Sequence, residues 1–302
     1  MNKSNNLTCF FLDFNLDETE GVFITNVLLC VLNSLFSLLT SVGNFVILHA
    51  IRKAHHFHSP ALILLCCLAF SDFLVGAICQ PFLVAYKIAE IVDNFNAYCT
   101  LRMFQLISSY ILSSVSLLTL AAVSIDRLLA LTLHLRYSSI VTVSRVFQSV
   151  FVFWILSTAG VMLRFWMSNF AWSSVLVISL LLTFMAIAFS TAKIFHIVRR
   201  HQRQINEQNM AALSLQSNTV NALKCKNSAV TVLYIYGLLL IFYLPFGVTV
   251  IVELFLGYTR PVKVAYGCVV TAVFINSLLN PLVYCWRIRE IRQAVKNVLR
   301  RD

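Results

Sequence analysis

The chain has 302 residues, of which 59% are hydrophobic and only 12% are charged, and its mean hydropathy is +0.83. A chain this long and this apolar is not a soluble globular protein. The formal net charge of +11 could suggest nucleic acid or acidic lipid as a partner, but the positions of the basic residues argue for membrane topology instead.

The first twenty residues are polar and acidic. They lack the charged-then-apolar order of a cleaved signal peptide, so we expect the first apolar segment to act as an uncleaved anchor. The only two Asn-x-Ser/Thr acceptors of the chain fall here, and we predict glycosylation at Asn2 and Asn6. Residues 1–21 are therefore predicted to form an extracellular tail.

Seven apolar runs follow, and each is long enough to cross a membrane core, which takes about 20 helical residues. They cover approximately residues 22–51, 59–86, 98–131, 143–165, 172–198, 227–255 and 262–285. Backbone polar groups in lipid must be paired within their own segment, so each run is predicted to be a helix. The sequence therefore predicts an all-α membrane protein, a seven-transmembrane helix bundle over residues 22–286, with a flexible loop at about 199–226.

Basic residues gather in alternate connections. With the N-terminus outside, 17 of the 23 Lys and Arg residues fall on the inner side, as the positive-inside rule requires. This topology leaves Cys9, Cys99 and Cys268 as the external cysteines, so at most one intramolecular bridge can form among them. We favour a link from Cys9 to one of the other two.

Asp72 is the most informative single charge. It lies eleven residues into an apolar run, which places it about 16 Å deep at the helical rise. A carboxylate there is protonated, paired or bound to a cation. No basic residue lies at the same depth, but oxygen and amide side chains do: Asn44, Ser116, Asn276, Ser277 and Asn280. Both a hydrogen-bonded polar knot and a cation site fit this set.

Three further features lie near helix ends. Asp126-Arg127 closes the third run, Pro245 interrupts the sixth, and Asn280-Pro281-Leu282-Val283-Tyr284 closes the seventh. Residues 287–302 alternate apolar and basic side chains at helical spacing, which predicts an amphipathic eighth helix on the inner leaflet.

Together with Asn44, Asp72 and Trp154, these motifs resemble the rhodopsin-like (class A) G-protein-coupled receptor family over about residues 22–300. The resemblance implies a plasma-membrane receptor whose partners are an extracellular ligand, the lipid bilayer and a heterotrimeric G protein, and not nucleic acid. It implies that coupling and activation rest on Asp126, Arg127, Leu135, Tyr243, Pro245, Asn280, Pro281 and Tyr284. It also implies a sodium ion as allosteric modulator, with no other metal and no cofactor, held by Asp72, Ser116, Asn276 and Asn280.

The chain departs from the family pattern at several positions. Leu128 replaces the usual Tyr after Arg127, and Tyr243 stands where the family has Trp. Lys224-Cys225-Lys226 replaces the acid that often locks the Arg, so we expect elevated basal activity. The short loop at about 166–171 has no Cys, and the fifth run has no Pro. These features are similar to those of melanocortin receptors and of lipid, cannabinoid and adenosine receptors.

The sequence narrows the class of ligand without identifying the ligand. Ser109 stands where amine receptors have an Asp, and Phe274 stands where opsins have a Lys, so the resemblance disfavours an amine agonist and retinal. Neutral and apolar side chains are expected to line the cavity, which favours a lipid-like or neutral small molecule. These side chains are Gln80, Gln105, Ser109, Tyr110, Ser113, Phe242, Tyr243, Phe246 and Phe274. A peptide attracted by Glu253, Arg102 and Arg260 at the rim stays open.

Two other classes of membrane protein are the alternatives to a receptor. A multi-pass transporter is the main alternative, but such proteins usually contain inverted repeats and Gly/Pro-interrupted half-helices, and neither pattern is found here. An intramembrane hydrolase needs a base or metal ligands at one depth, and Asp72 has no acidic or His partner in the sequence at its depth. We therefore expect a receptor that is not an enzyme.

Overall fold

The computed structural model describes residues 6–9, 12–15, 22–53, 59–133, 136–211, 216–287 and 289–299. Within these ranges the side chains of both strands, of most of residues 201–235 and of residues 287, 289, 290 and 299 are not described.

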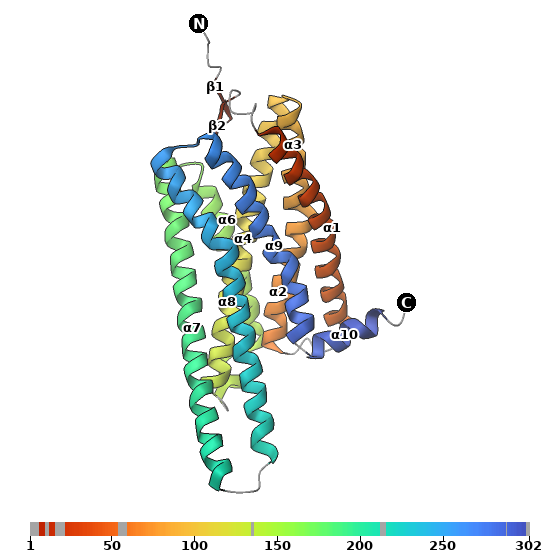
Figure 1. Cartoon of the computed structure of the whole chain (residues 1–302), viewed down its shortest axis with the longest axis vertical. Coiled ribbons are helices and arrows are strands. Elements are labelled where there is room, and N and C mark those ends of the chain that lie inside the picture. The colour runs from red at the N-terminus through yellow and green to blue at the C-terminus, as the bar shows by residue number, and fades with distance from the viewer. Residues whose placement is uncertain are drawn as a thin grey trace.

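The described chain contains seven helices that are long and apolar enough to cross a membrane, and they stand side by side in one bundle (Figure 1). The spans are α1 (Phe23–Lys53), α2 to α3 (Pro60–Ile91), α4 (Phe95–Leu133), α6 (Val143–Leu163), α7 (Asn169–Ala211), α8 (Gln216–Leu256) and α9 (Arg260–Arg287). Large apolar side chains such as Leu38, Phe151 and Leu182 are exposed on the outside of the bundle, where lipid tails would cover them. The predicted seven-transmembrane helical architecture is confirmed.

The second span is not a uniform α-helix. It consists of α2 (Pro60–Leu74), the π-helical turn η2 (Val75–Cys79) and α3 (Gln80–Ile91). Pro81 has no N–H to continue the α-helical ladder, and the Gln80 N–H bonds the Val75 carbonyl instead. The turn brings the backbone against α1, where the Ser37 hydroxyl donates to the Gly76 carbonyl at 2.7 Å. Only a glycine fits here, because a Cβ at position 76 would lie 2.8 Å from the Ser41 backbone nitrogen.

The predicted loop at about 199–226 is largely helical, which corrects the sequence-based expectation. Helix α7 continues to Ala211 and α8 begins at Gln216, so both extend beyond the other helices at one end of the bundle (Figure 1). The segment is rich in Gln, Arg, Lys and Ala, which favour helix, and it contains neither Gly nor Pro to end one.

Three small elements complete the fold. The tail forms an antiparallel hairpin of β1 (Asn6–Cys9) and β2 (Leu12–Asn15), so the all-α prediction holds for the membrane part and not for the tail. A single turn, α5 (Tyr137–Ile140), follows α4. Helix α10 (Arg289–Leu299) lies across the end of α1 and buries Ile291 and Val298, in the place predicted for an amphipathic eighth helix (Figure 1).

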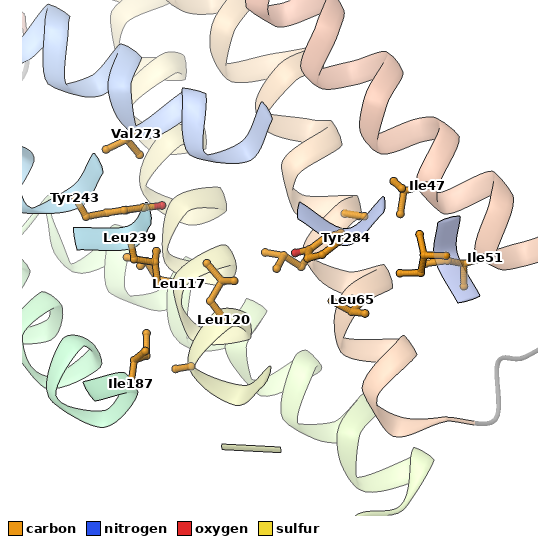
Figure 2. Packing of buried hydrophobic residues seen from close by; sticks show 14 residues of the cluster. Ile47, Ile51, Leu65, Leu117, Leu120, Ile187, Leu239, Tyr243, Val273 and Tyr284 are labelled. Carbon is orange, nitrogen blue, oxygen red and sulfur yellow. The ribbon is translucent and has the colours of Figure 1, made fainter. Parts of the chain in front are cut away.

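The main core cluster joins most of the spans near the middle of the bundle. Leu117 and Leu120 of α4 pack with Ile187 of α7, Leu239 and Tyr243 of α8, and Val273 of α9, and the same cluster continues to Tyr284 and Ile47 (Figure 2). Dense packing of this kind transmits a shift of one side chain to its neighbours.

Candidate functional site: a cavity, a buried carboxyl and an arginine

A cavity of about 700 Å³ opens between α3, α4, α6, α7, α8 and α9. This is within the range of about 300–1,000 Å³ that small-molecule sites occupy. We name the end of the bundle that contains it the cavity end and the opposite end the Arg127 end.

Seven of the residues expected to line a ligand site do line this cavity, namely Gln105, Ser109, Tyr110, Ser113, Tyr243, Phe246 and Phe274. Gln80 is not among its walls. It is fully buried, and neither atom of its amide has a hydrogen-bond partner among the described residues. Phe242 instead packs against the core cluster.

The expectation of a neutral wall was wrong. Four basic side chains line the cavity, from α3, α4, the end of α6 and α9: Lys87, Arg102, Arg164 and Lys263. Sequence reasoning missed Lys87, Arg164 and Lys263 because a basic residue near a helix end usually points to solvent or to lipid headgroups. The one local signal was the spacing Lys87-x-x-Glu90, which brings the two side chains together on a helix.

Lys87, Glu90 and Lys263 form a buried ion cluster. The Lys87 Nζ lies 3.0 Å from Glu90 Oε2, and the Lys263 Nζ contacts Glu90 Oε1. All three side chains are at most 5% exposed. Two buried ammonium groups therefore share the Glu90 carboxylate.

Arg164 lies just after α6 and completes the opposite wall. Its guanidinium donates to the Met167 carbonyl at 3.1 Å and to the Asn169 side-chain oxygen. Burial lowers the pKa of Arg164, but arginine stays protonated at neutral pH, so this wall is also positively charged.

The floor of the cavity is continuous with the core cluster. Leu117, Tyr243 and Val273 belong to both the cavity wall and the cluster that reaches Tyr284 (Figure 2). The Tyr284 hydroxyl is buried and has no hydrogen-bond partner among the described residues, so its position is not fixed by a polar contact. A molecule pressing on Tyr243 would therefore act on packing that extends towards Tyr284.

Asp72 lies between the cavity and the Arg127 end and is fully buried. The Asn280 amide donates to its Oδ2 at 2.6 Å, and the Ser116 hydroxyl to its Oδ1 at 3.4 Å. The Asn44 amide donates to the Ser277 carbonyl at 3.1 Å and ties α1 to the same region. Three of the four residues predicted for a sodium site are thus in contact.

The fourth predicted residue, Asn276, is not among the described side chains that hydrogen-bond Asp72. Its Nδ2 is buried and has no hydrogen-bond partner among the described residues. No described basic side chain lies within ion-pair distance of Asp72, so this carboxyl is held by neutral donors alone. Such a set suits either a hydrogen-bonded knot or a hard cation.

Arg127 is held in a local ion pair. Its Nε lies 3.0 Å and its Nη2 2.5 Å from Asp126 Oδ2. The Tyr137 hydroxyl of α5 donates to the other oxygen, Oδ1, at 2.6 Å. Burial and the Asp126 carboxylate raise the pKa of Tyr137, so the hydroxyl keeps the proton that it donates. Tyr137 is a site residue that the sequence analysis did not identify.

Pro245 and Pro281 both lie inside helices. In α8, the Thr249 hydroxyl donates to the Pro245 carbonyl at 2.9 Å. In α9, Pro281 follows Asn280, whose amide holds Asp72, and lies opposite Gly43 of α1. Each proline removes one backbone hydrogen bond and weakens its helix at that point.

Some predicted residues fall where less is described. Leu135 and Asn2 lie outside the described residues, and for Asn6 and Cys9 only the backbone strand is described. Cys99 is disulfide-bonded and Cys268 is a free, exposed thiol, which removes Cys268 from the three candidates for a bridge. Among the described residues no group of three or more His, Cys, Asp or Glu side chains could hold a metal ion.

The family comparison agrees with this geometry. Residues 43–174 match the model of the 7 transmembrane receptor (rhodopsin family), a range that includes Asp72 and Arg127. Over this range the chain is similar to the rhodopsin-like family of seven-transmembrane receptors.

A similar curated protein is trace amine-associated receptor 1 of Mus musculus. It is 27% identical over 294 residues, which cover 89% of this chain and 87% of the relative. The similarity therefore spans most of this chain and most of the relative.

Proposed function

We propose that this receptor binds an extracellular ligand in the cavity and transmits the event to a heterotrimeric G protein at the Arg127 end. The observation that carries the proposal is the continuity of the cavity floor with the core cluster through Leu117, Tyr243 and Val273. Allosteric coupling needs two sites and an element between them that both can bias. Here the cavity and the Asp126–Arg127 pair are the sites, and the Pro245-containing helix α8 lies between them.

The proposed orientation places the N-terminal tail outside the cell and α10 on the cytoplasmic face of the plasma membrane. It rests on the basic residues of the Arg127 end, among them Arg52, Lys53, Arg145 and Arg200. It leaves the cavity open towards the exterior. It also places Asn2 and Asn6 in the compartment where glycosylation occurs.

The name of the mouse relative refers to trace amines, but we do not propose an amine as the ligand here. An ammonium group needs a carboxylate partner, and the α4 side of the cavity presents Gln105, Ser109 and Ser113 instead. Glu253 is the only carboxylate among the described cavity walls, and it accepts a hydrogen bond from the Tyr266 hydroxyl at 2.5 Å.

We also propose that sodium binds at Asp72 and favours the resting receptor. The support is a buried carboxyl that, among the described residues, is held only by neutral donors. A cation at this depth would compensate the cost of burying the carboxylate.

The direct test is nucleotide exchange on a panel of purified G proteins by the full-length receptor in phosphatidylcholine nanodiscs. Wild-type receptor should accelerate exchange by at least one G protein, and Arg127→Ala should lower that rate by about tenfold or more. Arg145→Gln, an exposed arginine at the same end, is the matched control and should leave the rate unchanged. If the wild-type receptor accelerates exchange by no member of the panel, the proposal is overturned.

Leu135 provides a second test of the contact surface. Leu135→Asp puts a charge where the family places an apolar side chain into the G protein, and the desolvation cost should weaken coupling. Thermal stability of the variant should stay close to wild type, which separates loss of coupling from loss of folding.

A further inference from the structure

We propose that the cavity opens sideways into the membrane between α6 and α7, and that its ligand is a neutral amphiphile that enters from the bilayer through this opening. The inference rests on the proposed function, because it takes the cavity as the ligand site, and it adds the class of ligand and the route. We name the opening the side portal. It is lined by Leu156, Ser157 and Gly160 of α6 and by Val175 and Ser179 of α7.

The first support is that the cavity reaches the outer surface of the bundle at two separate places. At the cavity end, in the charged mouth that Lys87 and Lys263 line, Gly257 is a cavity residue that is also exposed. Deeper in the bundle, Leu156 and Val175 line the cavity too, although they are 59% and 46% exposed. A side chain that lines a cavity and is exposed on the outside marks the edge of an opening.

The side portal lies at a depth where lipid tails surround the bundle. Leu156 is seven residues before the end of α6, and Val175 is six residues after the start of α7, so both lie about 10 Å in at the helical rise. The 21 residues of α6 span about the thickness of the hydrocarbon core. The opening therefore faces hydrocarbon and not water.

The second support is the packing of the two helices. Helix α6 packs on α2 and α4, and α7 packs on α4 and α8, but in the described part of the chain α6 and α7 barely approach each other. They are nevertheless consecutive spans joined by a short turn. Behind the space between them, Ser114 and Leu118 of α4 line the cavity. The side portal thus leads directly to the cavity wall formed by α4.

The third support is Gly160. Small residues in membrane helices usually allow a neighbouring helix to pack closely. No such neighbour is present here, because a Cβ at Gly160 would have no described atom within 4 Å. The missing side chain therefore widens the portal and does not serve a helix contact.

The fourth support is the hydroxyl of Ser157, which is buried without a hydrogen-bond partner among the described residues. Hydroxyl groups in membrane helices commonly donate to a carbonyl of their own helix. Across the portal, Ser179 donates to the Leu176 carbonyl and Thr183 to the Ser179 carbonyl, each at 2.8 Å. An unmade hydrogen bond in an apolar environment is costly, so a hydroxyl, ester or amide group of a ligand would be favoured beside Ser157.

The chemistry of the route excludes an ion. None of the five residues that line the portal is charged, and an ionised group would have to leave water and cross hydrocarbon to reach them. Beyond the portal, Leu117, Leu118 and Leu180 line the cavity and suit an acyl chain. Such a chain would lie against the core cluster to which Leu117 belongs.

The test uses 1-oleoylglycerol with a diazirine in the middle of its acyl chain, in phosphatidylcholine nanodiscs that hold the full-length protein. After irradiation, mass spectrometry identifies the labelled peptides. Label on exposed residues such as Phe151 and Ile178 reports contact with the bilayer alone. We expect label also on α4 around Ser114 and Leu118, and excess unlabelled 1-oleoylglycerol should remove it. The same competition should need at least about tenfold more 1-octadecene, which has no hydrogen-bonding group.

Variants connect the label on α4 to the side portal. Leu156→Trp and Val175→Trp fill the portal from either helix and should lower the competed label on α4 by about tenfold. The matched controls are Phe151→Trp and Ile178→Trp, which change exposed residues of the same helices that do not line the cavity. Both should label as wild type does. All four variants should keep a melting temperature close to wild type, because each changed side chain is exposed.

The hydroxyl of Ser157 has its own test. Ser157→Ala breaks no hydrogen bond among the described residues, so its stability should match wild type. Competition by 1-oleoylglycerol should weaken by about tenfold, while competition by 1-octadecene should not change. Ser174→Ala is the control, since this hydroxyl donates to the Phe170 carbonyl and does not line the cavity.

The outcomes separate this inference from the proposed function. Competed label on α4 in a protein that accelerates no nucleotide exchange would keep the side portal and contradict the receptor proposal. Exchange that is lost in Arg127→Ala, without competed label on α4, would keep the receptor and overturn the portal. Equal competed label in wild type, Leu156→Trp and Val175→Trp would overturn the route, and equal competition by 1-octadecene and 1-oleoylglycerol would overturn the class of ligand.

Discussion

Two buried carboxyl groups in this protein are held in opposite ways. Glu90, at the cavity end, lies between the ammonium groups of Lys87 and Lys263. Asp72, deeper in the bundle, is held by the neutral side chains of Ser116 and Asn280. The Glu90 carboxylate is paired with positively charged neighbours, whereas Asp72 has no cation beside it among the described residues. Ion pairs thus hold the buried carboxyl at the cavity end, whereas hydrogen bonds from neutral side chains hold the one at the centre of the bundle.

The largest expected effect is that of removing the charge of Glu90. Glu90→Gln removes the carboxylate that Lys87 and Lys263 share, which should destabilise the protein by about 3–5 kcal/mol. A thermal melt of the purified protein measures the change. Adding Lys87→Met and Lys263→Met to Glu90→Gln should restore most of the lost stability. A Glu90→Gln variant that melts with wild type would mean that the ion cluster is not formed.

The close contact between η2 and α1 at Gly76 should be the next most sensitive position. Gly76→Ala puts a Cβ 2.7 Å from the Ser41 hydroxyl and 2.8 Å from its backbone nitrogen, so α1 and the π-turn must separate. Overpacking of this kind costs about 1–3 kcal/mol. Gly237→Ala is the control, because nothing lies within 4 Å of a Cβ there. Equal melting temperatures for the two variants would contradict the described approach of η2 to α1.

The Arg127 end should respond to loss of one hydrogen bond. Tyr137→Phe removes the donor to Asp126 Oδ1 and frees the carboxylate that holds Arg127. A hydrogen bond to a charged group contributes about 1.5–3 kcal/mol, but water can replace part of it at this partly exposed tyrosine. We therefore expect basal nucleotide exchange to rise several-fold at matched expression. An unchanged or lower rate would show that Tyr137 does not restrain the pair.

The smallest change in stability is expected at Asp72. Asp72→Asn keeps an acceptor for Asn280 and leaves no cation unpaired, so in the absence of sodium the free energy of unfolding should change by about 1 kcal/mol or less. The same variant should lose the stabilisation that sodium gives to wild type relative to N-methylglucamine. Wild type that melts identically in the two cations would remove the sodium proposal. Glu90→Gln, in contrast, should keep its sodium response. This difference between the two variants tests whether the two carboxyl groups are held in opposite ways.

The membrane spans could be predicted from the sequence, because each span depends on a local pattern of residues. A span is a run of about 20 apolar residues whatever it packs against, and Asp72, Arg127 and Asn280 stand out because each interrupts or ends such a run. All seven cavity residues that were predicted and found are on α4, α8 or α9, the helices that contain Arg127, Pro245 and Asn280. Gln80 was misassigned because the π-turn before it rotates the start of α3 relative to a regular helix.

The charged mouth was not predictable in the same way. Lys87 and Lys263 are 176 positions apart in the sequence, and only the packing of α3 against α9 brings them to Glu90. Each alone is typical of a basic residue at a membrane interface. The helical extensions of α7 and α8 were missed for a different reason, since their composition is compatible with both a polar loop and an exposed helix.

The disulfide partner of Cys99 could be predicted from the sequence only in part. The sequence limited its candidates to Cys9 and Cys268, and the free thiol of Cys268 removes one. We propose Cys9 as the partner, which would hold the tail hairpin over the cavity end. Peptide mapping under non-reducing conditions should recover the two cysteines in one linked pair of peptides. Alkylation of Cys9 without prior reduction would exclude the pair.

The central claim is that the Asp126–Arg127 end of this bundle acts on G proteins, and basal nucleotide exchange tests it most directly. Lys224, Cys225 and Lys226 stand where an acid often restrains the Arg in this family, so the unliganded receptor should already accelerate exchange. We predict a basal rate above that of empty nanodiscs for at least one G protein, lost in Arg127→Ala and kept in Arg145→Gln. Equal rates for wild type and Arg127→Ala, at matched amounts of folded receptor, would contradict the account.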